Sequence, residues 1–371
     1  MLSYAQREGF FPRHRYPRLA LQCIAIVLLG LFLSLPIARA QTFAVSGTLT
    51  VDPDGLFSAV IDTKHGFAYF GTGFPGDFGF GRIVKVDLSS FRAVRILSLR
   101  TGEDNLVAGV IDPENGYAYF TTGTFPTHPS RIVKIDLANF MEVDSLGLSP
   151  DEFSCLCTAI IDTENGFAYF GTFSEPARVL KVDLSSFRIV DSLTLRQGDD
   201  DLNSAVIDPI HGFAYFGTFN GRIVKVNLHS FKEVRSVALN GADLGAPLTS
   251  AVIDPQNGFA YFGDYRTVTK IRLSSLQAAG SLTLNPGEAE MHSAVIDTTN
   301  GFAYFGLAGL GHPGITEINL STFTESRSVF VFTDPYLRNG LWSAVIDTYH
   351  GYAYWGSDGG EPRGIIIRVS L

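Results

Sequence analysis

Residues 58–72 read SAVIDTKHGFAYFGT, and close copies of this stretch return six more times along the chain. Each copy holds an aspartate, a glycine four residues later and then an aromatic-Ala-Tyr-aromatic segment. Successive copies lie 43 to 50 residues apart, which indicates a repeat protein. The seven aspartates are Asp62, Asp112, Asp162, Asp208, Asp254, Asp297 and Asp347.

Each copy continues with a variable loop and two further extended runs. Residues 82–88 (RIVKVDL) are typical of the first run, and residues 190–195 (VDSLTL) of the second. Turn signals separate the runs, and no segment after residue 41 has the 3.6-residue period of an amphipathic helix. Each copy therefore predicts four short strands. Seven such copies predict an all-β, seven-bladed β-propeller with four-stranded blades.

The two ends of the chain distinguish a closed propeller from an open solenoid. The seventh copy stops at Leu371 after its third strand, and residues 43–51 form a spare strand before the first copy. This spare strand is similar to the fourth strand of the other copies. We therefore expect it to complete the last blade from its outer edge, whereas a solenoid would need capping units.

The aromatic-Ala-Tyr-aromatic-Gly-Thr strand, followed by Arg-Ile-Val-Lys-Val-Asp-Leu, resembles the YVTN/NHL-type propeller repeats of secreted and surface proteins. The likeness covers essentially all of residues 43–371, although the YVTN tetrapeptide itself is absent. The resemblance implies a fold and not a chemistry.

Residues 1–40 have the pattern of a secretory signal peptide. Four arginines between residues 7 and 18 precede an apolar run at residues 19–37, which ends in Ala-Arg-Ala. We expect cleavage before Gln41, which leaves a single propeller domain at residues 41–371. An uncleaved anchor is the alternative, because 19 apolar residues just span a bilayer. The predicted location is secreted, periplasmic or on the cell surface.

The composition and the net charge exclude several classes of protein and of binding partner. The chain has 371 residues, 46% hydrophobic and 18% charged, which excludes a disordered protein. Without residues 1–40 it holds 23 Lys and Arg against 36 Asp and Glu, a net charge of −13. Such a surface repels nucleic acid and anionic lipid. We therefore expect a monomer without nucleic-acid partners and without membrane insertion of the mature chain.

Variable loops mark the predicted binding face. The loops between the second and third strands, and those between blades, differ in length and sequence on a uniform scaffold. The between-blade loops are acidic, which favours basic ligands or cations, with ordinary solvated charge as the alternative. The acidic residues are Glu103, Asp104, Asp151, Glu152, Asp199, Asp200, Asp201, Asp243, Glu288, Glu290 and Asp334.

The residue just before each predicted first strand should line the rim of the central channel. This position differs from copy to copy, unlike its neighbours. Trp342 is the leading contact candidate, with a packing role as the alternative. Phe57, Asn203 and His292 complete the predicted binding residues. The ligand stays open between a protein, a carbohydrate and a small molecule.

Two further sites follow from spacing. Asp199, Asp201 and Asn203 stand at i, i+2 and i+4, as at the opening of a calcium loop, but the later Gly and Glu of an EF-hand are missing. Calcium is the one cofactor considered, and otherwise none is expected. Cys155 and Cys157 are the only cysteines after the signal, and both a C-x-C disulfide and a free pair stay open.

Residues repeated in every copy are expected to build the scaffold. The aromatic strands should pack blade against blade. His65, His211 and His350 occupy a position that is Asn in the other copies, which indicates turn residues. Most copies have a lysine in the third strand, such as Lys85, and we expect it to pair with carboxylates. Glu317 interrupts this row.

No G-x-S-x-G, Walker or haem-attachment motif is present in the sequence. We therefore favour a binding or interaction module that uses the variable loops over an enzyme. The first alternative is a propeller enzyme of lactonase or lyase type, with Glu290, His292 and His312 at the channel mouth. The second is a structural surface-layer or matrix protein. Asn319 begins the only N-glycosylation sequon, which matters only in a eukaryotic host.

Overall fold

The structure is a computed structural model. It describes residues 42–51, 55–73, 80–123, 129–148, 155–239, 245–309, 313–331, 340–358 and 364–371. The chain divides into two units, Met1–Gln41 and Thr42–Leu371, and the description below concerns the second. The expected signal peptide therefore lies outside the described residues.

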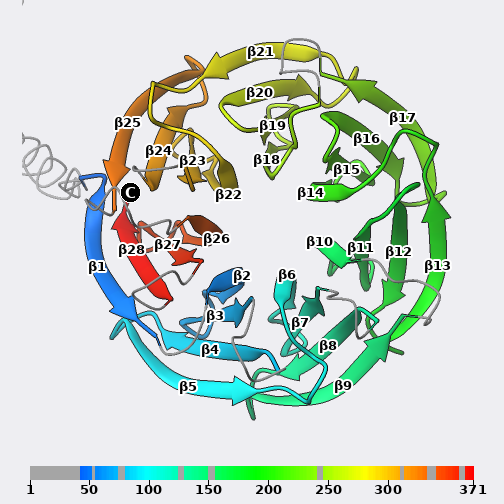
Figure 1. Ribbon diagram of the computed structural model, residues 1–371, viewed down its shortest axis with the longest axis vertical. Coiled ribbons are helices and arrows are strands. Elements are labelled where there is room, and N and C mark those ends of the chain that lie inside the picture. The colour runs from blue at the N-terminus through cyan, green and yellow to red at the C-terminus, as the bar shows by residue number, and fades with distance from the viewer. Residues whose placement is uncertain are drawn as a thin grey trace, which may run out of the picture. The chain divides into compact units, whose positions relative to one another are not determined.

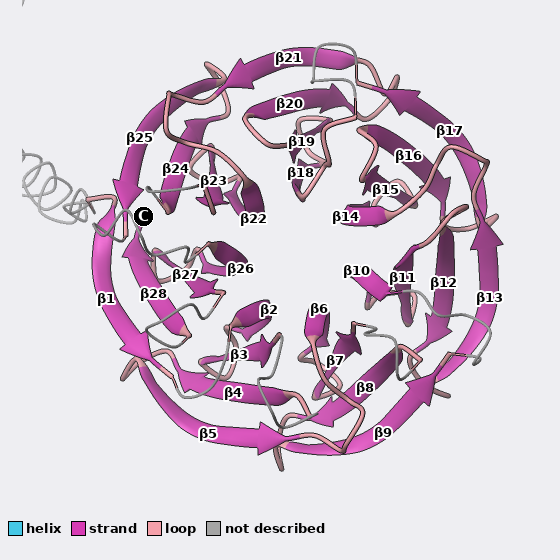
Figure 2. Cartoon of the chain, in the orientation of Figure 1, coloured by secondary structure: helices cyan, strands magenta, loops and turns pink. Residues whose placement is uncertain are grey.

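Seven four-stranded antiparallel sheets surround a central channel, which confirms the predicted seven-bladed propeller (Figure 1). Figure 2 shows strands and connecting loops, and no helix occurs in the described residues. Accordingly, that part of the chain contains no helix with the length and apolar character needed to cross a membrane.

The strands follow one another around the ring. Blade 1 contains β2 (Leu56–Asp62), β3 (Phe67–Thr72), β4 (Arg82–Asp87) and β5 (Arg92–Ser98). Blade 2 contains β6 (Leu106–Asp112), β7 (Tyr117–Thr122), β8 (Arg131–Asp136) and β9 (Met141–Gly147). Blade 3 contains β10 (Cys155–Asp162), β11 (Phe167–Phe173), β12 (Arg178–Asp183) and β13 (Arg188–Thr194). Blade 4 contains β14 (Leu202–Asp208), β15 (Phe213–Thr218), β16 (Arg222–Asn227) and β17 (Lys232–Ala238).

The other three blades complete the ring. Blade 5 contains β18 (Ser250–Asp254), β19 (Phe259–Gly263), β20 (Thr267–Arg272) and β21 (Ala278–Thr283). Blade 6 contains β22 (Met291–Asp297), β23 (Phe302–Leu307), β24 (Gly314–Asn319) and β25 (Thr324–Phe330). Blade 7 contains β26 (Leu341–Asp347), β27 (Tyr352–Ser357), β28 (Ile365–Ser370) and the N-terminal β1 (Ala44–Thr50).

The N-terminal strand closes the ring as predicted. β1 pairs antiparallel with β28, from Ala44 opposite Ser370 to Thr50 opposite Ile365. It forms the outer edge of blade 7, so this blade combines strands from both ends of the described chain (Figure 1). The sheet made by β26, β27 and β28 thus has the same four-stranded form as the other six.

The core lies between the blades, where large aromatic rings meet. Tyr69 of blade 1 packs on Phe140 of blade 2 with ring centroids 5.8 Å apart, and the pattern repeats around the ring. At the closure Phe43, which immediately precedes β1, packs on Tyr304 of blade 6 at 5.6 Å. These buried tyrosines and phenylalanines explain why the aromatic segment repeats in every copy.

Among the described residues, no ion pair joins the third-strand lysines to a carboxylate; they lie over aromatic rings instead, so that prediction is wrong. Lys225 Nζ lies 3.8 Å from the centroid of the Phe213 ring and donates a hydrogen bond to the carbonyl of Leu273 at 3.0 Å. Burial lowers the pKa of this lysine. In blade 6, Glu317 takes the lysine position and Arg327 donates two hydrogen bonds to it, at 2.7 and 3.0 Å.

The turn residues behave as predicted. In blade 2, Asn115 Nδ2 donates to Asp112 Oδ2 at 2.7 Å. In blade 1, His65 Nδ1 lies 2.7 Å from Asp62 Oδ2, so the imidazole takes the place of the amide. The aspartate also accepts the backbone N–H of residue 65 or 115, which orders the turn between the first two strands.

In several blades a small hydroxyl donates a hydrogen bond to the inner strand of the next blade. Ser204 Oγ donates to the carbonyl of Leu248 at 2.7 Å, and Gly217 lies opposite this serine. A Cβ atom on Gly217 would lie 2.4 Å from Ser204 Oγ, so the serine requires a glycine partner. Blade 2 reverses the pair: Ala108 lies opposite Thr121, and Thr121 Oγ1 donates to the carbonyl of Leu156 at 2.7 Å.

Candidate functional site

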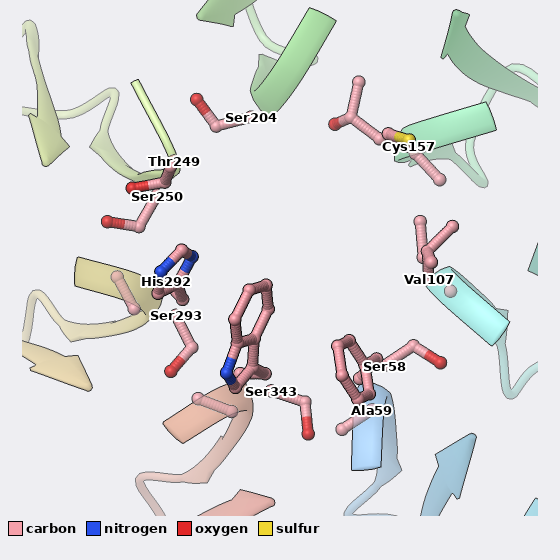
Figure 3. Close-up of a pocket in the computed structure, with 18 of the residues that line it drawn as sticks. Ser58, Ala59, Val107, Cys157, Ser204, Thr249, Ser250, His292, Ser293 and Ser343 are labelled. Carbon is pink, nitrogen blue, oxygen red and sulfur yellow. The ribbon is translucent and has the colours of Figure 1, made fainter. Parts of the chain in front are cut away.

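Two pockets contain candidate binding residues, and both are lined by residues at the N-terminal ends of the inner strands. The central channel has a volume of about 190 Å³ and is lined by serine, threonine and alanine side chains with a few larger residues at its rim (Figure 3). Beside it, blades 4 to 7 enclose a second cavity of about 370 Å³, which we call the mouth pocket. Its lining residues are Asn203, Phe219, Pro247, Thr249, Tyr265, Glu290, His292 and Trp342.

Three predicted binding residues line the mouth pocket because of local irregularities in the inner strands. The inner strands begin two residues earlier than predicted, so Asn203, His292 and Trp342 are each the second residue of such a strand and do not precede it. Each lies at a register shift in the pairing with the second strand. Such a β-bulge leaves a residue outside the regular ladder and redirects its side chain. This position can therefore vary between blades without disturbing the sheet.

The rim of the channel is built around a stack of rings. His292 and Trp342 are nearly parallel, at 14°, with ring centroids 3.9 Å apart. Phe57 packs against the same tryptophan at 5.0 Å and lines the channel, but not the mouth pocket. Trp342 is therefore held between two neighbours. Burial lowers the pKa of His292 to about 4, so its imidazole is neutral at pH 7.

Two aromatic residues of the pocket were missed by the sequence reasoning. Phe219 and Tyr265 follow the second strands of blades 4 and 5 and are 46% and 51% exposed. The equivalent position is Phe173 in blade 3, but glycine in blades 1 and 2 and alanine in blade 6. A comparison of this position across the copies would have singled out three adjacent blades with an exposed aromatic ring.

Glu290 is the one acidic residue among the described residues that line the pocket, and its backbone is left-handed, with φ of 60°. Its N–H donates to the carbonyl of Tyr265 at 2.6 Å, which ties the loop to blade 5. Asn105 and Asp201 occupy the equivalent positions in two other loops, with φ of 50° and 51°. Asn and Asp adopt the left-handed backbone conformation at a lower energetic cost than other non-glycine residues. The conformation is therefore less favourable for Glu290 than for Asn105 or Asp201.

The loop before Glu290 contains a buried carboxyl group beside another one. Glu288 is 3% exposed, and its burial together with the neighbouring Glu325 raises its pKa. In the matching loop between blades 3 and 4, Asp199 Oδ1 instead accepts a hydrogen bond from Arg222 Nε at 2.7 Å. Blade 6 has Gly314 at the position of that arginine, so no guanidinium takes this place beside Glu288.

This arrangement predicts a pH-dependent stability. Because its pKa is raised in the folded state, the Glu288 contribution is complete below its ordinary pKa of about 4.3 and is lost as pH rises through the raised value. We expect Glu288→Gln to raise the melting temperature at pH 8 by about 2 °C, with a smaller gain at pH 5. Thermal melts at both pH values test this.

The matched control for that melt is Asp199→Asn in the loop between blades 3 and 4. Asp199 Oδ1 accepts a hydrogen bond from Arg222 Nε at 2.7 Å, so its neutral variant should lower the melting temperature at pH 8. Equal gains from both variants, or a gain from Glu288→Gln that does not change with pH, would contradict the assignment of the raised pKa to Glu288.

The three predicted calcium residues have different surroundings in the structure. Asp199 is buried against Arg222 and Ser236, Asp201 has a left-handed backbone, and Asn203 lines the mouth pocket. In the part of the chain that the structure describes, no three His, Cys, Asp or Glu side chains form a group that could hold a metal ion. Calcium binding stays a prediction without a supporting geometry.

The remaining predicted residues lie apart from the mouth pocket or outside the described ranges. The structure places a disulfide between Cys155 and Cys157 at the start of β10, with Cα atoms 5.3 Å apart. Cys157 lines the channel across from the mouth pocket (Figure 3). His312, a candidate of the enzyme hypothesis, lies outside the described residues, as do Asp151, Glu152, Asp243 and Asp334.

No protein-family model matches the chain, and no curated protein is significantly similar to it. The fold is therefore established by the strand pairing alone, and the likeness to YVTN/NHL-type repeats stays a resemblance.

Proposed function

We propose that this protein is an exported binding module that holds a small ligand in the mouth pocket. The observation that carries the proposal is the convergence of two exposed rings, Phe219 and Tyr265, with the stacked pair of His292 and Trp342 on one cavity. A concave site lined by aromatic rings and a few polar groups is the usual form of a small-molecule site. The export rests on the predicted signal peptide.

The distribution of repeated and variable residues supports the same proposal. Side chains that recur in all blades, such as Tyr69 and its equivalents, are buried between blades and account for the scaffold. The pocket residues occupy positions that differ from blade to blade. Variation confined to one face of a repetitive scaffold is typical of a recognition surface.

The state of His292 favours binding over acid–base catalysis. A general acid must carry a proton at the working pH, and a general base works best with a pKa near that pH. The pKa of about 4 makes this imidazole a poor acid and a weak base at neutral pH. Its stacking on Trp342 is a packing role that supports the pocket wall.

A thermal-shift screen tests the proposed function. The probes are divalent cations, sugars, lactones and small amines, applied to the purified protein. We expect at least one probe to raise the melting temperature, because a ligand that binds only the native state stabilises it. The shift should be lost in Tyr265→Ala, whose side chain is half exposed.

Tyr349→Ala is the matched control for the screen. Tyr349 is 89% exposed and lies in the turn between β26 and β27, on the opposite face of the ring from the mouth pocket. The ligand-induced shift should persist in this variant. A flat screen, or a shift that Tyr265→Ala leaves unchanged, would count against a small-ligand site in the mouth pocket.

A further inference from the structure

We infer that the mouth pocket, which Trp342 helps to line, selects a small alkylammonium cation, such as a trimethylammonium group, held by the exposed rings of Phe219 and Tyr265 and by the carboxylate of Glu290. This inference rests on the proposed function and adds the chemical class of the ligand.

The charge of the pocket points to a cation. Among the described residues, no lysine or arginine lines it, and Glu290 is the single acidic residue of that lining. His292 contributes no positive charge at neutral pH, because burial lowers its pKa to about 4. The pocket therefore carries one negative charge in a chain whose net charge is −9. A cation is attracted to such a site, and an anion is repelled.

The aromatic rings that line the pocket can also bind a cation. Cations bind over the faces of Trp, Tyr and Phe rings, and quaternary ammonium groups are commonly held in cages of such rings. The same interaction already occurs between this protein's own residues: Lys181 Nζ lies 3.8 Å from the centroid of the Phe167 ring and 5.9 Å from that of Tyr169. In the mouth pocket, the rings of Phe219 and Tyr265 are about half exposed and have no lysine over them among the described contacts.

The residue type at position 290 agrees with a ligand role for its carboxylate. The two equivalent loops use Asn105 and Asp201 at the left-handed position, where these residue types are favoured. Glutamate is less favoured than Asn or Asp in this backbone conformation, but its longer side chain places a carboxylate at the pocket wall. Residues held in unfavourable backbone conformations cluster at binding and active sites.

The size of the cavity limits the ligand. At about 370 Å³ the mouth pocket lies near the lower end of the range for small-molecule sites. Among the described lining residues, Asn203, Thr249 and the Tyr265 hydroxyl are the uncharged groups that offer hydrogen bonds to a ligand, besides the ring nitrogens. A trimethylammonium group needs few such partners, because its methyl groups contact the rings and its charge faces the carboxylate.

Calorimetric titration with choline and with its neutral isostere 3,3-dimethylbutan-1-ol tests the inference. The two probes differ only in the charged nitrogen. We expect choline to bind about tenfold more tightly or better. Glu290→Gln should reduce choline affinity about tenfold and leave the isostere unchanged, and Asp104→Asn, in a loop outside the pocket, should change neither. Glu290→Asn, with a residue type suited to the left-handed backbone, is the second variant and should lose choline affinity without losing thermal stability.

The outcomes separate the inference from the proposed function. Equal binding of both probes, with no effect of Glu290→Gln, would overturn the choice of a cation and leave the mouth pocket as a binding site. Failure of choline alongside a sugar or lactone shift that depends on Tyr265 would do the same. Failure of every probe to act through Tyr265 would overturn both.

Discussion

Removal of residues 42–51 is expected to abolish the cooperative thermal unfolding of the propeller. These residues contain β1, which forms the outer strand of blade 7 and pairs with β28 over its length. Phe43 and Val51 at its two ends are buried, and Phe43 packs on Tyr304 of the preceding blade. The loss of this burial, of the strand ladder and of the ring closure should cost more than about 5 kcal/mol. Circular dichroism melts of the truncated and full proteins measure the effect.

Two single substitutions make that experiment quantitative. Phe43→Ala should cost about 3–5 kcal/mol, as expected for a buried phenylalanine. Phe43→Leu should cost less than about 1.5 kcal/mol, because Leu276 already takes the equivalent packing position in blade 5. A truncated protein that unfolds cooperatively at the full-length temperature would contradict closure by β1.

Gly217→Thr is expected to destabilise blade 4 strongly, and Ser204→Ala is expected to rescue it. The new Cβ would lie 2.4 Å from Ser204 Oγ and 2.8 Å from Leu248 Cβ, which should cost about 3 kcal/mol. Ser204→Ala alone removes the hydrogen bond to the carbonyl of Leu248 and should cost about 1–3 kcal/mol. The double variant recreates the pair found at Ala108 and Thr121 of blade 2.

Urea unfolding of the four proteins gives the coupling between the two positions. Ser204→Ala removes the approach to Ser204 Oγ but leaves the 2.8 Å approach to Leu248 Cβ, so we expect the double variant to lie within about 2 kcal/mol of the original protein. The coupling should then reach about 2 kcal/mol. The reverse exchange in blade 2, Ala108→Ser with Thr121→Gly, provides the matched control. Additive losses in blade 4 would show that the hydroxyl and the glycine are not a single structural unit.

The repeat predicted the architecture because each copy carries the complete pattern of one blade. The period-2 strands, the Asp-x-x-x-Gly turn and the spare strand at residues 43–51 each correspond to a feature of the structure. The lysine row was misjudged for a different reason. Lys85 lies over Phe67 of its own blade and near Phe140 of the next, at 4.0 and 5.6 Å. The contact depends on the position of the adjacent blade, which the sequence of one copy does not contain.

The sequence predicted three residues of the mouth pocket and missed two others. Asn203, His292 and Trp342 stood out because their position varies between copies, and the β-bulge explains why variation is tolerated there. Phe219 and Tyr265 were missed because they directly follow a conserved strand pattern and were grouped with the variable loops. Phe219, Tyr265 and Trp342 belong to blades 4, 5 and 7 but line the same pocket. These residues are far apart in the sequence, and only the closed ring brings them to one cavity.

The indole N–H resonances of the two tryptophans test the central claim most directly. Trp342 lines the mouth pocket, whereas Trp355 is fully buried in the core of blade 7 and serves as an internal reference. In a ¹H–¹⁵N NMR titration with choline, assigned with Trp342→Phe, the Trp342 resonance should shift and saturate while the Trp355 resonance stays in place. A Trp342 resonance that does not move at saturating choline would contradict the assignment of the mouth pocket as an ammonium-binding site.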